Sequence, residues 1–246
     1  MAAQRRLSLA RLITGPMLFI MAVGLIIQSA SAIAAFALNA DVRDLAESIE
    51  KGFQPDADYL SRFVSRNDFH RPASDCGNAI TRSRLTVSLA ALERTMKGNN
   101  IALRDAANKN ALDVAKHRLT CNPLDGNAWL GFAMVKTQVS GPIPAAVDAL
   151  RLSYWSAPNE SWVMVARLPF ATRLYLAGVA GFESEYMEDL RRFATFESTY
   201  QVAATYVAIA PRIQALLHPL IAAQTEPRKK AIVAEIDRLG LIFDAQ

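Results

Sequence analysis

The sequence has few of the residues and motifs that mark most enzymes. Its histidines number three (His70, His117 and His218), and its cysteines number two. It contains neither the G-x-S-x-G motif of serine hydrolases nor a glycine-rich loop that would cradle phosphates. We therefore expect no metal, no cofactor and no enzymatic activity.

The body of the chain also lacks an excess of charge of one sign. The formal net charge is +4, but Arg5, Arg6 and Arg11 are the only charged residues before Asp41. Three of the 27 Lys and Arg thus precede Asp41, which leaves 24 against the 23 Asp and Glu of the remaining chain. A nucleic-acid-binding surface needs a concentrated basic excess, so we expect no nucleic-acid partner. With 52% hydrophobic residues, the chain is not a disordered protein either.

Charge is absent altogether from Leu12 to Ala40. Residues 12–38 supply 27 mostly apolar positions, whereas a helix needs roughly 20 to cross a bilayer, and this predicts a transmembrane signal anchor. The arginines of residues 1–11 predict a cytoplasmic N-terminus, which places the bulk of the chain in the periplasm of a bacterium. The alternative is a signal peptide cleaved at Ala30-Ser31-Ala32, which would release a soluble periplasmic module.

The two cysteines, Cys76 and Cys121, lie on the predicted exported side, where disulfides form and persist. A bridge between them would close a loop of about 45 residues and contribute about 3–4 kcal/mol of stability on the loop-entropy model. The alternative is two buried free thiols. We favour the disulfide because of the predicted compartment.

Apolar residues of the exported part recur with the 3.6-residue period of helices, and no series of short alternating strands is present. The sequence therefore predicts an all-α fold. The expected helices cover residues 42–51, 56–65, 80–96, 102–120, 128–139, 145–156, 183–197 and 227–239, with another opening near Pro158 and a kinked, buried pair over 200–223. The expected divisions are short helices and a loop over 39–79, helical hairpins over 80–170, and C-terminal helices over 171–246.

The helix-opening segments repeat along the chain. Pro123 and Pro158 are 35 residues apart, and the tryptophans that follow them, Trp129 and Trp162, are 33 apart, which indicates a unit of two helices. Around these segments the sequence resembles tetratricopeptide-type helical repeats. The small and large apolar positions of that family's second helix fall on Ala146 and Leu150, with a poorer match at Ala111 and Ala115. The resemblance covers residues 80–170 and implies a stack of helical hairpins.

A second resemblance lies in residues 150–168, LRLSYWSAPNESWVMVARL. This stretch is similar to membrane-anchored helical-repeat proteins of alphaproteobacteria that occur alongside surface-polysaccharide export functions. It implies a role in the cell envelope.

The same stretch contains the candidate partner-binding residues. Tyr154, Trp155 and Trp162 could line a peptide groove, and Arg167 could add a basic rim. Packing inside the repeats is the alternative explanation for the aromatic residues.

One enzymatic alternative concerns Glu183, which with Ser184 resembles the catalytic acid of soluble-type lytic transglycosylases. The rest of that family's motifs are missing, and a first-turn acid favoured by the helix dipole is the simpler interpretation.

We expect a membrane-anchored periplasmic scaffold or adaptor that binds protein partners in cell-envelope or exopolysaccharide assembly. The soluble periplasmic module is the alternative.

Overall fold

The computed structural model describes residues 20–30, 39–66, 69, 76–96, 98–241 and 243. Within these residues every regular element is a helix, so the all-α prediction is confirmed. After residue 39 the helices are α2 (Ala40–Glu50), α3 (Ala57–Val64), α4 (Asn78–Met96), α5 (Ile101–Cys121), α6 (Gly126–Ser140), α7 (Pro144–Ser156), α8 (Ser161–Leu176), α9 (Glu183–Phe196), α10 (Thr199–Ala208), α11 (Pro211–Ala222) and α12 (Glu226–Arg238).

Local sequence sets where several helices begin. Asp56, Asn100, Asp125 and Ser198 precede α3, α5, α6 and α10, and each accepts a hydrogen bond from a backbone N–H of the first turn. Such capping satisfies donors that have no partner inside the helix. These local contacts mark where the four helices begin.

Prolines determine where two further helices begin. α7 begins at Pro144, and Pro211 divides the expected pair over 200–223 into α10 and α11. Proline suits the first turn of a helix because its missing N–H would have no partner there.

The division expected after residue 170 does not coincide with a helix boundary, because α8 continues through Pro169 to Leu176. A proline inside a helix removes one backbone hydrogen bond. The flanking side chains of Leu168, Phe170 and Leu174 are buried in the core, so their packing holds the helix together across the proline.

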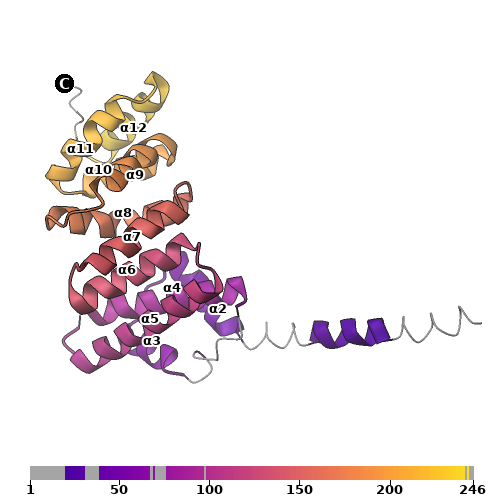
Figure 1. Cartoon of the computed structure of the whole chain (residues 1–246). Coiled ribbons are helices and arrows are strands. Elements are labelled where there is room, and N and C mark those ends of the chain that lie inside the picture. Colours follow the sequence, from indigo (N-terminus) through magenta and orange to yellow (C-terminus); the bar gives the residue numbers. More distant parts are fainter. Residues whose placement is uncertain are drawn as a thin grey trace, which may run out of the picture.

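The helices stack in chain order along one long axis, with α2 to α5 at one end and α10 to α12 at the other (Figure 1). Chain neighbours pack in pairs, α4 on α5, α6 on α7 and α8 on α9. One core forms among α2 to α6, a second extends from α6 to α12, and a small third cluster lies between α4, α5 and α6. Since α6 contributes Ala128 to the first core and Leu130 to the second, it joins the two parts of the stack.

The turns between these pairs also touch. A Cβ atom on Gly126, at the start of α6, would lie 2.3 Å from the Cβ of Ala157, which follows α7. Only glycine permits this approach, so the α5–α6 turn packs directly on the α7–α8 turn.

The described residues include no helix that is both long enough and apolar enough to cross a bilayer. Of the predicted anchor, residues 20–30 are helical and exposed. Its other residues, 12–19 and 31–38, and the n-region 1–11 lie outside the described residues.

A disulfide joins Cys76, just before α4, to Cys121, the last residue of α5, with a Cα–Cα distance of 5.3 Å. The structure thus has a bridge where the sequence predicts one. The buried Arg118 strengthens the same corner, since its Nη1 donates to the Asn78 carbonyl at 2.6 Å and its Nε to Asp125 Oδ2 at 2.6 Å. The bridge and the arginine together hold the start of α4 against the end of α5.

We predict that Cys76→Ser with Cys121→Ser lowers the free energy of unfolding by about 3–4 kcal/mol, because the unfolded chain regains the entropy of a long loop. Urea denaturation of the oxidised protein and of the double variant measures the difference. Addition of a reductant should lower the stability of the oxidised protein to that of the variant and leave the variant unchanged. Equal stability of both proteins without reductant would contradict the prediction.

Candidate functional site

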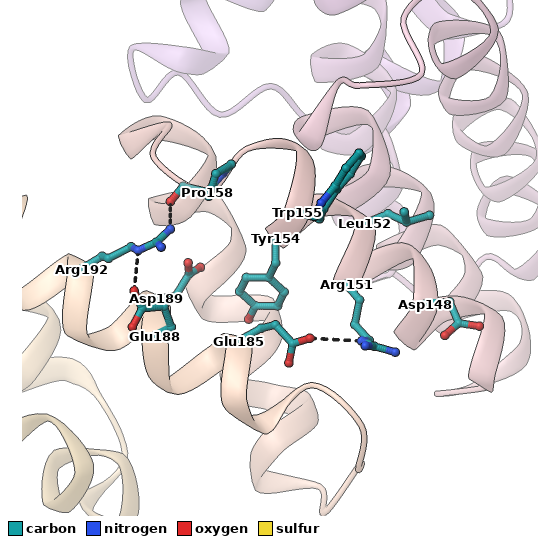
Figure 2. Close-up of a pocket in the computed structure, with 10 residues that line it drawn as sticks. All are labelled: Asp148, Arg151, Leu152, Tyr154, Trp155, Pro158, Glu185, Glu188, Asp189 and Arg192. Atoms are coloured by element: carbon teal, nitrogen blue, oxygen red, sulfur yellow. Dashed lines mark hydrogen bonds and ion pairs between the residues drawn. The ribbon is translucent and has the colours of Figure 1, made fainter.

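A groove of about 560 Å³ lies between α7 and α9 (Figure 2). The α7 wall presents Asp148, Arg151, Leu152 and Trp155, and the α9 wall presents acidic residues one helical turn apart, Glu185 and Glu188. The α7–α8 turn closes one end with Pro158. The groove thus has an acidic α9 wall and, on α7, an apolar part formed by Leu152 and Trp155, which we call the apolar wall.

Trp155 dominates the apolar wall because 71% of its surface is exposed. It stands at the end of α7, where Ala157 and Pro158 stop the helix and no following turn covers the indole. A tryptophan this exposed is an available contact surface for a partner.

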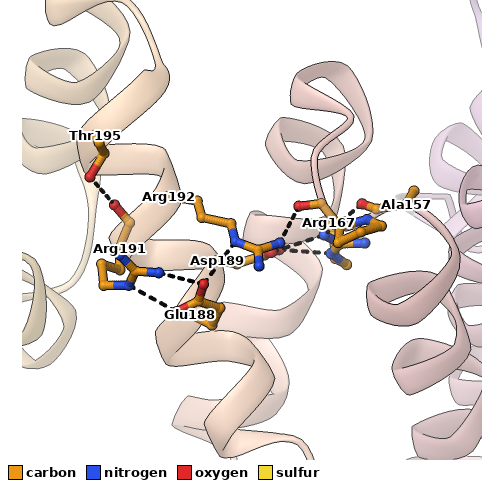
Figure 3. A network of polar contacts seen from close by, with 8 residues as sticks. Ala157, Arg167, Glu188, Asp189, Arg191, Arg192 and Thr195 are labelled. Atoms are coloured by element: carbon orange, nitrogen blue, oxygen red, sulfur yellow. Dashed lines mark hydrogen bonds and ion pairs between the residues drawn. The ribbon is translucent and has the colours of Figure 1, made fainter.

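Asp189 on α9 lines the floor of the groove, and the fully buried Arg167 on α8 lies beneath it. Its Nε donates to Asp189 Oδ2 at 2.7 Å and its Nη2 to Asp189 Oδ1 at 2.9 Å. Its Nη1 donates to the carbonyl and the hydroxyl of Ser153 at 2.8 and 3.1 Å, and its Nη2 to the Ala157 carbonyl at 3.5 Å. One guanidinium thus ties α7, α8 and α9 together (Figure 3).

Tyr154 lies beneath the rim, with Arg167 Cζ 4.2 Å from the centre of its ring. Burial raises the pKa of its phenol, so the group stays neutral at physiological pH. Among the described residues, the buried Tyr154 hydroxyl has no hydrogen-bond partner. Burial also raises the pKa of Asp189, and the Arg167 guanidinium opposes that rise.

Ion pairs lie along the rim of the groove, and one of them crosses from α7 to α9. Arg151 Nε lies 3.1 Å from Glu185 Oε1. Glu188 receives both Arg191, at 2.6 Å, and Arg192, at 2.8 Å (Figure 3). The hydrogen bond from Arg191 holds the pKa of Glu188 below its usual value, so this carboxylate is ionised at neutral pH.

The structure separates the four residues that the sequence proposes as a binding surface. Trp155 lines the groove and is exposed, but Tyr154 and Arg167 are buried. The assignment of Arg167 to a basic rim is therefore wrong, because its donors are taken by the protein interior. Trp162 does not line the groove, although 43% of its surface is exposed, and Arg82 Cζ lies 4.3 Å from its ring.

Sequence reasoning missed the acidic wall. Glu185, Glu188 and Asp189 recur at the i, i+3 and i+4 spacing that places side chains on one helix face. That spacing was visible, but nothing in the sequence indicates that this face lies opposite α7.

The described part of the chain contains no cluster of three or more His, Cys, Asp or Glu that could hold a metal ion. His117 lies one helical turn before Cys121 in α5. Its Nε2 is 3.8 Å from Cys121 Sγ, but this sulfur is engaged in the disulfide.

Comparison of the chain with protein-family models, with curated proteins and with solved structures finds no match. The groove and the sequence are therefore the two sources of information on what this protein does.

We predict that Arg167→Met lowers the free energy of unfolding by about 3–5 kcal/mol, because it leaves the Asp189 carboxylate buried without a counter-charge. The double variant Arg167→Met with Asp189→Leu should be more stable than this single variant, since both buried charges are then gone. Chemical denaturation measures the three proteins.

Arg151→Met is the matched control, because it breaks an ion pair between the same elements, α7 and α9, at the surface. This variant should lower the free energy of unfolding by less than about 1 kcal/mol. Equal losses in the two single variants would show that the buried pair has no special role.

Proposed function

We propose that this chain is a membrane-anchored periplasmic scaffold or adaptor that binds protein partners through the outer surface of its helical stack. The observation that carries the proposal is the open groove between α7 and α9 with Trp155 exposed on its wall. Stacks of helices offer extended surfaces of this kind, which suit the binding of other proteins.

Further exposed aromatic residues support a binding role. Phe196, at the end of α9, is 77% exposed, and Tyr200, in the first turn of α10, is 54% exposed. Phenylalanine and tyrosine are enriched in protein–protein interfaces relative to the rest of the protein surface.

We further propose that the hairpins over residues 80–170 are tetratricopeptide-like. Ala111, Ala115, Ala146 and Leu150, which carry that resemblance, are all completely buried. The pairing of α4 with α5 and of α6 with α7 agrees with a unit of two helices. Small buried residues permit the close approach that such stacking requires.

The anchor is proposed from the uncharged stretch 12–38 and the arginines that precede it. Confinement to a membrane would raise the effective concentration of the scaffold near other anchored proteins. The resemblance of residues 150–168 to repeat proteins found with polysaccharide export supports cell-envelope or exopolysaccharide assembly as the process.

The transglycosylase alternative has less support. Glu183 is exposed at the start of α9, and its Oε2 accepts the N–H groups of Gly181 at 2.8 Å and Phe182 at 3.0 Å. Backbone N–H groups, its own first and then that of Gly181, hold the pKa of Glu183 below its usual value. A general acid for glycoside cleavage needs the opposite, a raised pKa.

We predict that Glu183→Gln leaves partner binding unchanged and slightly destabilises the protein at neutral pH. A carboxyl group whose pKa is lowered by folding stabilises the protein when ionised, and this stabilisation disappears as the pH falls through its folded-state pKa. Urea denaturation at neutral and at acidic pH should show the two proteins converging in acid. Loss of function in the folded variant would favour the enzyme.

The scaffold itself is tested by purifying the full-length, C-terminally tagged protein from gently solubilised membranes. Mass spectrometry should find the bait with residues 12–38 intact and accompanied by envelope-assembly proteins. A bait that begins near Ile33 and comes alone would contradict both the anchor and the scaffold, and would favour the soluble periplasmic module.

A further inference from the structure

We propose that the groove between α7 and α9 binds a lysine or arginine side chain presented by a segment of a partner protein. This inference rests on the proposed scaffold function and names the chemistry that the partner must carry. The segment would place its cation among the carboxylates of the groove. Either the aliphatic stem of that side chain or a neighbouring apolar residue would then pack against Trp155.

The charge of the groove favours a cation. Four carboxylates line it, those of Asp148, Glu185, Glu188 and Asp189, against the two guanidinium groups of Arg151 and Arg192. The Arg167 charge beneath the floor is matched by Asp189. Arg151 pairs with Glu185, and Arg191 and Arg192 pair with Glu188, so among the described residues Asp148 is the acid of the lining that takes part in no ion pair.

An independent observation points to a missing donor. The Tyr154 side chain is 94% buried and lines the groove, and its hydroxyl is directed toward α9 beside Glu185 (Figure 2). No described group donates to or accepts from this hydroxyl. A buried hydroxyl without a partner is costly, so a donor that reaches it is favoured. An ammonium or guanidinium group supplies such a donor.

The entrance to this position is held by a contact that opens easily. The Arg151 to Glu185 ion pair crosses the groove near Tyr154 (Figure 2), and its side chains are 55% and 29% exposed. Exposed pairs of this kind contribute little stability. An incoming cation can therefore replace Arg151 on Glu185 and reach the Tyr154 hydroxyl.

The apolar wall suits the rest of such a side chain. Leu152 and Trp155 are the apolar groups of α7 that remain partly or largely exposed beside the acids. The methylene stems of lysine and arginine pack on apolar surface, and their charged ends also interact favourably with an indole ring.

The test uses the full-length protein in detergent and two degenerate libraries of short peptides, identical except for a fixed central lysine or glutamate. Fluorescence anisotropy of labelled peptides measures binding. The lysine library should bind about tenfold more tightly, and added salt should weaken its binding. Equal binding by the two libraries overturns the proposal.

Variants locate the bound peptide. Trp155→Ala, and Asp148→Asn combined with Glu185→Gln, should each weaken binding of the lysine library at least about fivefold. The matched controls are Trp162→Ala, an exposed tryptophan outside the groove, and Glu226→Gln, an exposed acid paired with Lys229 on α12. Equal losses of peptide binding in the control variants would show that the groove is not the binding site.

Tyr154→Phe separates a binding role from a structural one. It removes a hydroxyl that makes no hydrogen bond, so the stability should be unchanged or raised while lysine binding weakens. Unchanged lysine binding in this folded variant overturns the role of the hydroxyl.

A second copy of this chain or a lipid surface in the groove would give different results from a partner protein. If Trp155→Ala abolishes self-association or vesicle binding and leaves peptide binding intact, the groove meets a second copy or a lipid surface and the proposal is wrong. If envelope proteins co-purify equally with the wild type and the groove variants, the groove inference fails while the scaffold stands. If no protein co-purifies with any of them, the scaffold fails.

Discussion

The buried guanidinium of Arg167 is the constraint on which the arrangement of α7, α8 and α9 depends. A charge removed from water must be neutralised and its donors satisfied, or the folded state loses several kcal/mol. Arg167 meets this demand with Asp189 from α9 and with the carbonyls of Ser153 and Ala157 at the end of α7. These partners hold α7 and α9 together beneath the groove that the two helices line.

A second buried arginine has a similar place nearer the N-terminal end of the stack (Figure 1). Arg118, near the end of α5, is neutralised by Asp125, the residue that caps α6, and donates to the Asn78 carbonyl in α4. The disulfide lies at the same corner. Directional polar contacts thus hold helices together near their ends, while small and apolar residues fill the space between them.

The groove differs from these corners because its polar groups are not all matched within the chain. Glu185 and Glu188 have arginine partners at the surface, but Asp148 has no ion pair among the described residues and the Tyr154 hydroxyl has no partner there. At the groove these unmatched groups lie beside an exposed tryptophan, whereas the guanidinium groups of Arg118 and Arg167 are bound by the protein interior. This contrast is the physical basis for placing partner binding at α7 and α9.

The sequence by itself determined the fold class, most helix boundaries and the pair of cysteines that could form a bridge, because periodicity, capping residues and prolines act over a few residues. It also offered Trp155 as a candidate for partner binding, and the structure shows this side chain exposed. Only the tertiary structure decided that Arg167 and Tyr154 are buried and that the acidic face of α9 lies opposite α7. Helical spacing shows which residues share a face, but it does not show which other helix that face meets. That is decided by packing between segments far apart in the chain.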